Sequence, residues 1–232
     1  MPRPSCMVFA ARYLPPEEIR GKEVLEVGAC DFNGSIKPYV QHWSPKSYLG
    51  IDMIEGPCVD KVMNADTLEA EFGQESFDIV ISIEMMEHTR WWRTSLTNMK
   101  RVCRRGGLLL ITSPAIGYPY HGYPTDFWRY EIDDFKKMLA DFEIIGIERD
   151  ESGPGTFVVA RKPMDYQECD LGPIELFSVV TGQRTREVSE ADFKAPYFKR
   201  QTFKVRLKEF VEGTYRWLGR CVTKILGLKQ KA

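Results

Sequence analysis

Residues 24–35 read VLEVGACDFNGS, and this stretch decides how the rest of the chain is interpreted. A short, mainly aliphatic run that ends in a glycine is typical of a buried strand that leads into a ligand-binding loop. The dinucleotide fingerprint GxGxxG is absent, because five other residues separate Gly28 from Gly34. An acid in the loop, Asp31, would also repel a phosphate. The stretch therefore predicts a cofactor loop for a ligand that has a cationic centre and no phosphate.

Further aliphatic runs follow this one at regular intervals. Continuous apolar runs suit strands that are buried on both faces of a parallel sheet, and the segments between them are long enough for crossover helices. The turn signal ESGPG predicts that the last two strands form an antiparallel hairpin. Strands are expected at 23–27, 48–52, 60–65, 77–83, 107–112, 142–150 and 156–162, and helices at 87–105 and 132–139.

This pattern predicts an α/β protein with a Rossmann-like, seven-stranded, mostly parallel sheet, a terminal antiparallel hairpin and helices on both faces. A C-terminal helical appendage is expected in addition. The predicted domains are residues 1–162, which bind the cofactor, and residues 163–232, a loop-rich segment followed by a basic amphipathic helix.

The composition restricts the setting. The six cysteines are scattered without a CxxC pair, and no apolar run approaches the roughly 20 residues that span a bilayer. We therefore expect a cytoplasmic protein, with attachment to a membrane surface left open. Charge is unevenly distributed, because residues 194–232 contain eleven Lys and Arg against two acids, while the whole chain has a net charge of −1.

Ligands of an open α/β sheet bind beyond the carboxyl ends of its strands. Asp52 ends the second predicted strand, 24 residues after Gly28, which is close to the spacing at which an acid binds ribose hydroxyls. The other strand ends contribute Glu26, Asp66 and Glu84. Several polar side chains are thus expected at one edge of the sheet.

The ordered series VLEVGACDFNGS, YLGIDM, NAD, FDIVISIEMMEH, GGLLLITSP and HGYPTDFWRY resembles class I S-adenosylmethionine-dependent methyltransferases over about residues 20–162. S-adenosylmethionine is cationic and lacks a phosphate, as the loop requires. The resemblance implies that Glu26 and Gly28 shape the pocket for the methionine portion and that Asp52 binds the ribose. It further implies that Met53 lines the adenine and that Asp66 approaches the adenine amine. Ala29, Asp31, Asn33 and Glu84 complete the expected cofactor-binding set.

Methyl transfer to an oxygen or nitrogen benefits from a base or a metal. Glu84, Glu87 and His88 would share one face of a helix, and His121 follows the fifth strand. We predict catalytic roles for His88, His121 and Glu84. A divalent metal on Glu84, Glu87, His88 and His121 is a further hypothesis, which resembles ubiquinone-pathway O-methyltransferases and small-RNA 3′-end methyltransferases. The alternative without a metal is that Glu84 contacts the cofactor and that His88 acts as a base or caps a helix.

The aromatic loop at residues 113–131 suits a substrate wall. Its candidate substrate residues are Tyr120, His121, Tyr123, Asp126 and Arg129. The competing interpretation is structural, with Asp126 paired to Arg129 and Trp128 in the core.

From Phe203 onward, apolar and basic residues alternate at helical spacings. Such a helix could pack on its own domain, form a homodimer, lie on an anionic membrane surface or contact nucleic acid.

The expected function is O-methylation of a small molecule, a sugar or a lipid-linked glycan precursor. One alternative is a metal-dependent RNA 3′-end methyltransferase. The acidic body of the chain argues against this alternative, because RNA binding favours a basic surface. The other is a non-catalytic module that binds cofactor or a partner.

Overall fold

A seven-stranded sheet forms the centre of the computed structural model, which describes residues 3–32, 34–122, 125–205, 207 and 214. The strand order is β3-β2-β1-β4-β5-β8-β7. The first five strands pair in parallel, while β8 is antiparallel to both β5 and β7. The expected sheet with its terminal hairpin is confirmed. The strands are β1 (Glu23–Val27), β2 (Ser47–Asp52), β3 (Lys61–Val62), β4 (Phe77–Ile83), β5 (Cys103–Pro114), β7 (Glu143–Arg149) and β8 (Gly155–Arg161).

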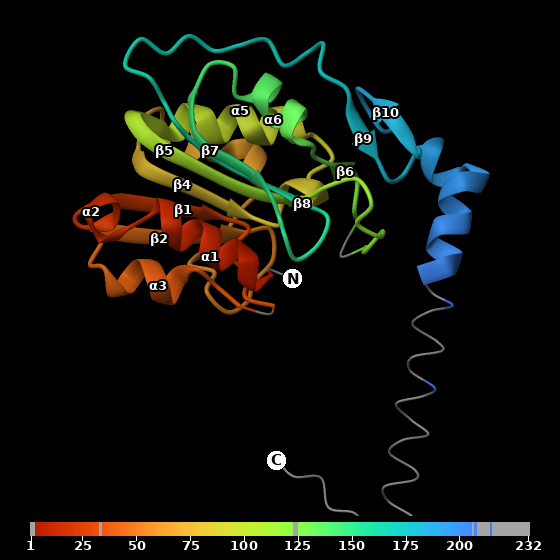
Figure 1. Ribbon diagram of the computed structural model, residues 1–232, viewed down its shortest axis with the longest axis horizontal. Helices are drawn as coiled ribbons and strands as arrows, with labels where there is room; N and C mark the ends of the chain where they lie inside the picture. Colours follow the sequence, from red (N-terminus) through yellow and green to blue (C-terminus); the bar gives the residue numbers. More distant parts are fainter. Residues whose placement is uncertain (1–2, 33, 123–124, 206, 208–213, 215–232) are drawn as a thin grey trace, which may run out of the picture.

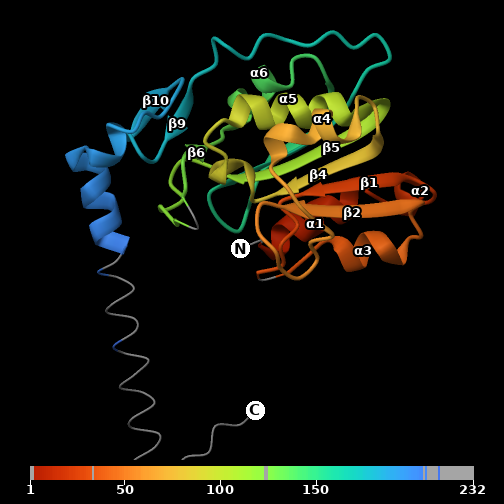
Figure 2. The same ribbon diagram turned by 180° about the vertical axis from the view of Figure 1, so that it is seen from behind.

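Helices cover both faces of this sheet (Figures 1 and 2). Because side chains alternate along a strand, Leu108 and Leu110 of β5 pack toward one face while Leu109 and Ile111 pack toward the other. The first face is covered by α1 (Pro4–Tyr13), α2 (Pro16–Ile19) and α3 (Lys37–His42). The second is covered by α4 (Leu68–Phe72), α5 (Trp92–Val102) and α6 (Ile132–Met138).

The helix predicted over residues 87–105 is wrong at both ends. The chain leaves β4 through a short 3-10 turn, η2 (Met86–His88), and α5 begins only at Trp92. The pair Gly106-Gly107 does not end the helix but lies in an irregular part of β5. Gly106 has φ 77°, and a Cβ on Gly107 would lie 2.6 Å from the carbonyl oxygen of Asp78, so both positions need glycine.

Two strands from the segment after β8 join the earlier β6 in a second sheet, which the sequence pattern did not predict. Its order is β10-β9-β6, from β6 (Trp128–Arg129), β9 (Leu176–Ser178) and β10 (Gln183–Thr185). The chain crosses over α5 and α6 to reach it (Figure 1). Arg93 of α5 holds this crossing by donating to the carbonyl oxygens of Leu171 and Arg186 at 2.9 and 2.7 Å. The domain boundary at residue 162 stays a prediction.

Two short 3-10 helices, η1 (Ala65–Thr67) and η3 (Asp192–Lys194), complete the described elements, and residues 196–205 are helical. Most of the predicted basic helix lies outside the described residues. Across the part of the chain that the structure describes, no helix combines the length and apolarity needed to span a membrane.

Candidate functional site

A cavity of about 700 Å³ opens at the carboxyl ends of β1, β2 and β4, where the topology of the sheet predicts a ligand. Its walls are mainly apolar. Four methionines from four separate segments contribute to them: Met7, Met53, Met63 and Met85. Of the predicted cofactor residues, Glu26, Gly28, Ala29, Asp52, Met53 and Glu84 line the cavity.

The loop after β1 turns with the help of Asp31 rather than a second glycine. The carboxylate of Asp31 accepts a hydrogen bond from the Gly34 amide at 2.6 Å, and Asp52 accepts one from the Cys30 amide at 3.1 Å. Gly28 itself has φ 85°, and a Cβ there would meet the Met85 side chain at 2.5 Å. Asp31 therefore builds the turn and does not line the cavity, while Asn33 lies outside the described residues.

Glu26 is a buried acid at the floor of the cavity. Its carboxylate accepts a hydrogen bond from the Tyr48 hydroxyl. Burial raises the pKa of Glu26 to about 8, although the Lys37 ammonium opposes this effect. A cation placed beside Glu26 would stabilise its charged form, which matches the role expected near the methionine portion of the cofactor.

Asp52 and Met53 lie at the cavity wall, as expected for ribose and adenine contacts. Asp66 does not reach this wall, because its carboxylate accepts a hydrogen bond from Ser95 of α5. The neighbouring Asn64 and Ala65 line the cavity instead. The side chain of Asn64 also accepts from the Asp66 amide at 3.0 Å, which begins the 3-10 turn η1.

Glu84 follows β4 with φ 50°, an uncommon conformation for a non-glycine residue. This turn directs its carboxylate to Arg3, at 3.4 Å, and Arg3 also pairs with Asp150 at 2.7 Å. Burial and the nearby Glu87 raise the pKa of Glu84 to about 7, while Arg3 opposes the shift. Glu84 does not share a helical face with Glu87 and His88, because only the short 3-10 helix η2 follows β4 and Glu84 lies before it.

Glu87, His88 and His121 converge at the end of the cavity. The Glu87 Oε1 atom lies 3.6 Å from His88 Nε2 and 3.7 Å from His121 Nε2. Their ligand atoms lie within 4.8 Å of one another. Among the described residues, neither carboxylate oxygen of Glu87 has a hydrogen-bond donor, although both are buried. An unpartnered buried carboxylate between two imidazoles is a site for positive charge, either a proton or a metal ion.

The two histidines are held in different ways. The Nδ1 atom of His88 lies 2.8 Å from the carbonyl oxygen of Thr125. Because a carbonyl can only accept, Nδ1 carries a proton, and Nε2 is the ring nitrogen that faces Glu87. The Nδ1 atom of His121 lies 2.9 Å from Asp126. Burial lowers the pKa of His121, but the carboxylates of Asp126 and Glu87 outweigh it and raise the value to about 9.

Several predicted substrate residues have structural partners. Arg129 is fully buried, pairs with Asp126 at 2.6 Å and donates to the carbonyl oxygens of Tyr118 and Pro119. Asp126 and Arg129 thus fix the loop that carries His121 and do not line the cavity. The Tyr120 ring packs against Phe198. Tyr123 lies outside the described residues.

Sequence reasoning missed several wall residues. Four of them follow strands that were predicted correctly, so their positions after the strand ends could have indicated that they line the cavity: Phe32, Ile54, Met63 and Thr89. Met7 comes from α1, for which the sequence offered no signal of proximity to the sheet edge.

Residues 24–111 match a family model described as a methyltransferase domain. Over these residues the chain is similar to a methyltransferase domain. The matched residues run from β1 into β5 and include Glu87 and His88, whereas His121 lies beyond them.

Two curated methyltransferases are similar to part of this chain. A fatty-acid O-methyltransferase of Mycolicibacterium smegmatis is 26% identical over 137 residues, which cover 53% of this chain and 44% of the relative. A phthiotriol/phenolphthiotriol dimycocerosates methyltransferase of Mycobacterium ulcerans is 32% identical over 106 residues, which cover 41% of this chain and 38% of the relative. The chain thus spans less than half the length of these two relatives.

Solved structures share the fold of the seven-stranded sheet and its helices. A Burkholderia thailandensis 1,6-didemethyltoxoflavin-N1-methyltransferase, solved with bound 1,6-didemethyltoxoflavin and S-adenosylhomocysteine, has a TM-score of 0.52 at 17% identity, covering 69% of this chain and 77% of that one. A putative S-adenosylmethionine-dependent methyltransferase from Listeria monocytogenes has a TM-score of 0.56 at 13% identity, covering 71% and 98%.

Proposed function

We propose that this protein transfers the methyl group of S-adenosylmethionine to a hydroxyl oxygen of a small, lipid-type acceptor. The observation that carries the proposal is the Glu87, His88 and His121 group at the end of the cofactor cavity. The curated relatives, which include a fatty-acid methyltransferase and a dimycocerosate methyltransferase, support a lipid-type acceptor.

The cofactor is assigned to the part of the cavity formed by β1 and β2. Glu26 is placed to receive the cofactor ammonium and Asp52 to accept hydrogen bonds from the ribose, while Met53 and Ile54 provide apolar contact for the adenine. Methyl transfer from a sulfonium is an in-line displacement, so holding the acceptor oxygen in line with the methyl group supplies much of the rate.

His88 is assigned as the base. The hydrogen bond of its Nδ1 to Thr125 leaves Nε2 available for the proton of the acceptor hydroxyl. S-adenosylmethionine, when bound, would supply the methyl group to the acceptor oxygen, and His88 would accept the proton that the acceptor hydroxyl loses. Glu87, 3.6 Å away, stabilises the resulting imidazolium. A carboxylic acid is already ionised at neutral pH and needs no base, so this arrangement favours a hydroxyl acceptor.

The same three side chains also suit a divalent cation. Two imidazoles and a carboxylate are a common ligand set for zinc and similar metals, and Glu87 has two buried oxygens without donors among the described residues. Such an ion would polarise the acceptor oxygen. Glu84 does not belong to this set, because it faces Arg3. Retention of full activity after chelation and dialysis would exclude an essential ion.

Cofactor binding is tested by thermal shift with S-adenosylmethionine and S-adenosylhomocysteine. If neither ligand raises the Tm, the assignment fails. Acceptor class is tested with radiolabelled cofactor and matched lipid alcohols and fatty acids. Methylation confined to the acids would contradict the assigned role of His88.

The base is tested by His88→Asn. We expect kcat to fall by about 10²-fold or more, because general base catalysis typically contributes that much, with unchanged affinity for S-adenosylhomocysteine. His42→Asn is the matched control, since His42 is exposed on α3 and absent from the cavity wall. Equal activity of the two variants would remove His88 from the mechanism.

A further inference from the structure

The helical segment at residues 196–205 presents an exposed face that continues to Leu207. Its members are spaced as neighbours on one side of a helix. Phe203 and Leu207 are 64% and 50% exposed. We call this face the tail stripe, and it consists of Lys199, Arg200, Phe203, Lys204 and Leu207.

The opposite side of this helix is fixed to the body. Phe198 is buried, and its ring lies edge to face against Tyr120 and Phe193 at centroid distances of 5.5 and 5.3 Å. The Tyr197 ring packs so closely on Gly182 that a Cβ there would clash. Tyr120 directly precedes His121, so the tail stripe starts at a defined place beside the candidate active site.

The chemistry of the tail stripe fits an anionic lipid surface. Three cations alternate with two large apolar side chains, and no acid occurs between Asp192 and Glu209. Apolar side chains can insert at the level of the headgroups while Lys and Arg bind lipid phosphates. A nucleic acid would pair with the cations through its phosphates, which offer no apolar contact to Phe203 and Leu207. The full stretch 194–232 is strongly basic, whereas the rest of the chain is acidic.

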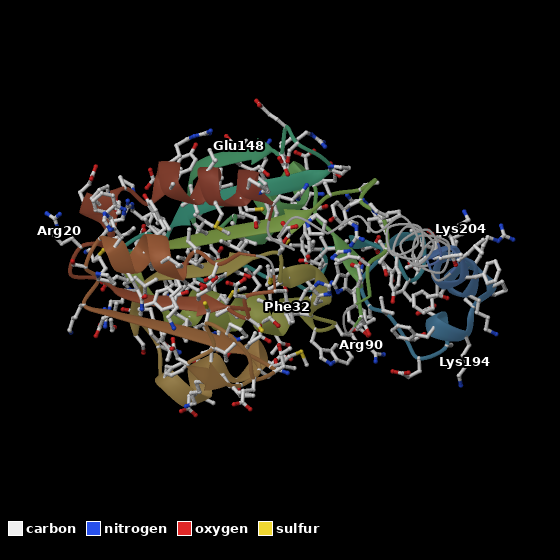
Figure 3. The ribbon with its side chains drawn as sticks, turned by 90° about the horizontal axis from the view of Figure 1, so that it is seen from below. Arg20, Phe32, Arg90, Glu148, Lys194 and Lys204 are labelled. Carbon is white, nitrogen blue, oxygen red and sulfur yellow. The ribbon has the colours of Figure 1, made fainter. Side chains whose placement is uncertain are left out.

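The wall of the cavity offers a second apolar surface. Phe32 lines the cavity beside the adenine contacts proposed above and is 52% exposed. Figure 3 shows Phe32 on the body of the molecule, with Lys204 on the helix to one side. Exposed apolar side chains at a cavity wall suit an acceptor that arrives from an apolar phase.

We infer that the tail stripe docks this protein on a bilayer that contains anionic lipids, and that the acceptor enters the cavity from this bilayer. Docking follows from the exposed residues of the helix. The entry of the acceptor rests on the proposed function.

The experiment is sedimentation of the full chain with vesicles of phosphatidylcholine alone and with 30 mol% phosphatidylglycerol. The test variant is Lys199→Gln/Arg200→Gln/Lys204→Gln. The matched control is Arg20→Gln/Lys136→Gln/Lys137→Gln, which removes three exposed charges from the body. Phe203→Ser/Leu207→Ser tests the apolar contribution.

We expect wild type and the control to bind anionic vesicles and to bind neutral ones far less. The test variant should lose at least about tenfold in vesicle affinity, because each cation near an anionic surface contributes substantially. Equal binding of test and control variants, or no binding of wild type, would overturn the inference. A dimer that wild type forms without lipid and that the test variant does not form would also overturn the inference. A second copy of the chain would then cover the tail stripe. S-adenosylhomocysteine should raise the Tm of the test variant as much as that of wild type. Loss of vesicle binding with this stabilisation retained separates failure of docking from failure of the proposed function.

Discussion

At the scale of single residues, Glu26 is an acid whose burial favours its neutral form. Its folded pKa of about 8 lies above the ordinary value of 4.5. Neutral Glu26 therefore contributes stability that is complete below about pH 4.5 and is lost as the pH rises through about 8. We expect the Tm of wild type to fall relative to that of Glu26→Gln between about pH 5 and 9. Parallel Tm curves, measured by calorimetry, would contradict this.

We expect the same acid to make cofactor binding release protons, since the proposed function assigns the cofactor ammonium to Glu26. A bound ammonium group beside Glu26 lowers its pKa, so at about pH 7 the carboxyl loses a proton when S-adenosylhomocysteine binds. The heat of S-adenosylhomocysteine binding, measured by calorimetric titration, should therefore depend on the ionisation enthalpy of the buffer for wild type. For Glu26→Gln, the heat should be the same in every buffer. Buffer-independent heats for wild type would place the ammonium elsewhere.

Two features require glycine at position 28. Its φ of 85° disfavours other residues, and an added Cβ would clash with the Met85 side chain. Gly28→Ala should weaken S-adenosylhomocysteine affinity by more than tenfold, because the clash moves the wall of the cavity. Gly21→Ala is the control, since Gly21 has a similar φ of 71° and nothing within 4 Å of an added Cβ. It should cost only about 1 kcal/mol of backbone strain and leave affinity unchanged. Binding isotherms for the two variants decide the comparison.

At the scale of elements, the sequence predicted the strands better than the connections. Continuous runs such as 77–83 are readable because a strand buried on both faces is apolar throughout. The turn at Glu84 was not readable, since its positive φ depends on tertiary partners such as Arg3, distant in sequence. The meeting of His88 with His121 was predicted, whereas the roles of Asp126 and Arg129 in fixing the loop were left open.

Phe198 connects the last described helix to the loop that carries His121. Phe198→Ala should lower kcat by about tenfold while leaving S-adenosylhomocysteine affinity unchanged, because the Tyr120 contact that positions His121 is lost. It should also cost about 3 kcal/mol of stability, as for other buried phenylalanines. Phe198→Leu should recover most of kcat. Ile145→Ala, which removes an exposed apolar side chain from β7, is the control, and equal losses in both variants would argue against a positioning role.

At the scale of the whole molecule, residues beyond 162 complete the main core. Leu171, Ile174, Leu176, Val180 and Val188 belong to the same buried cluster as β4, β5 and α5. A chain ending at residue 162 would expose this surface and should fail to fold, whereas one ending at residue 205 should still bind S-adenosylhomocysteine. Circular dichroism and a thermal shift on both chains test this. A stable, ligand-binding chain of 162 residues would instead support the predicted domain boundary.

The methionines of the cavity wall have a practical consequence. Met7, Met53, Met63 and Met85 surround the ligand space, and the chain has nine methionines in all. Thioether side chains are flexible and polarisable, so such a wall can adapt to the shape of the ligand that it holds. Their terminal methyl groups also give NMR signals after isotopic labelling. Four native reporters are therefore in place to map which part of the cavity each ligand occupies.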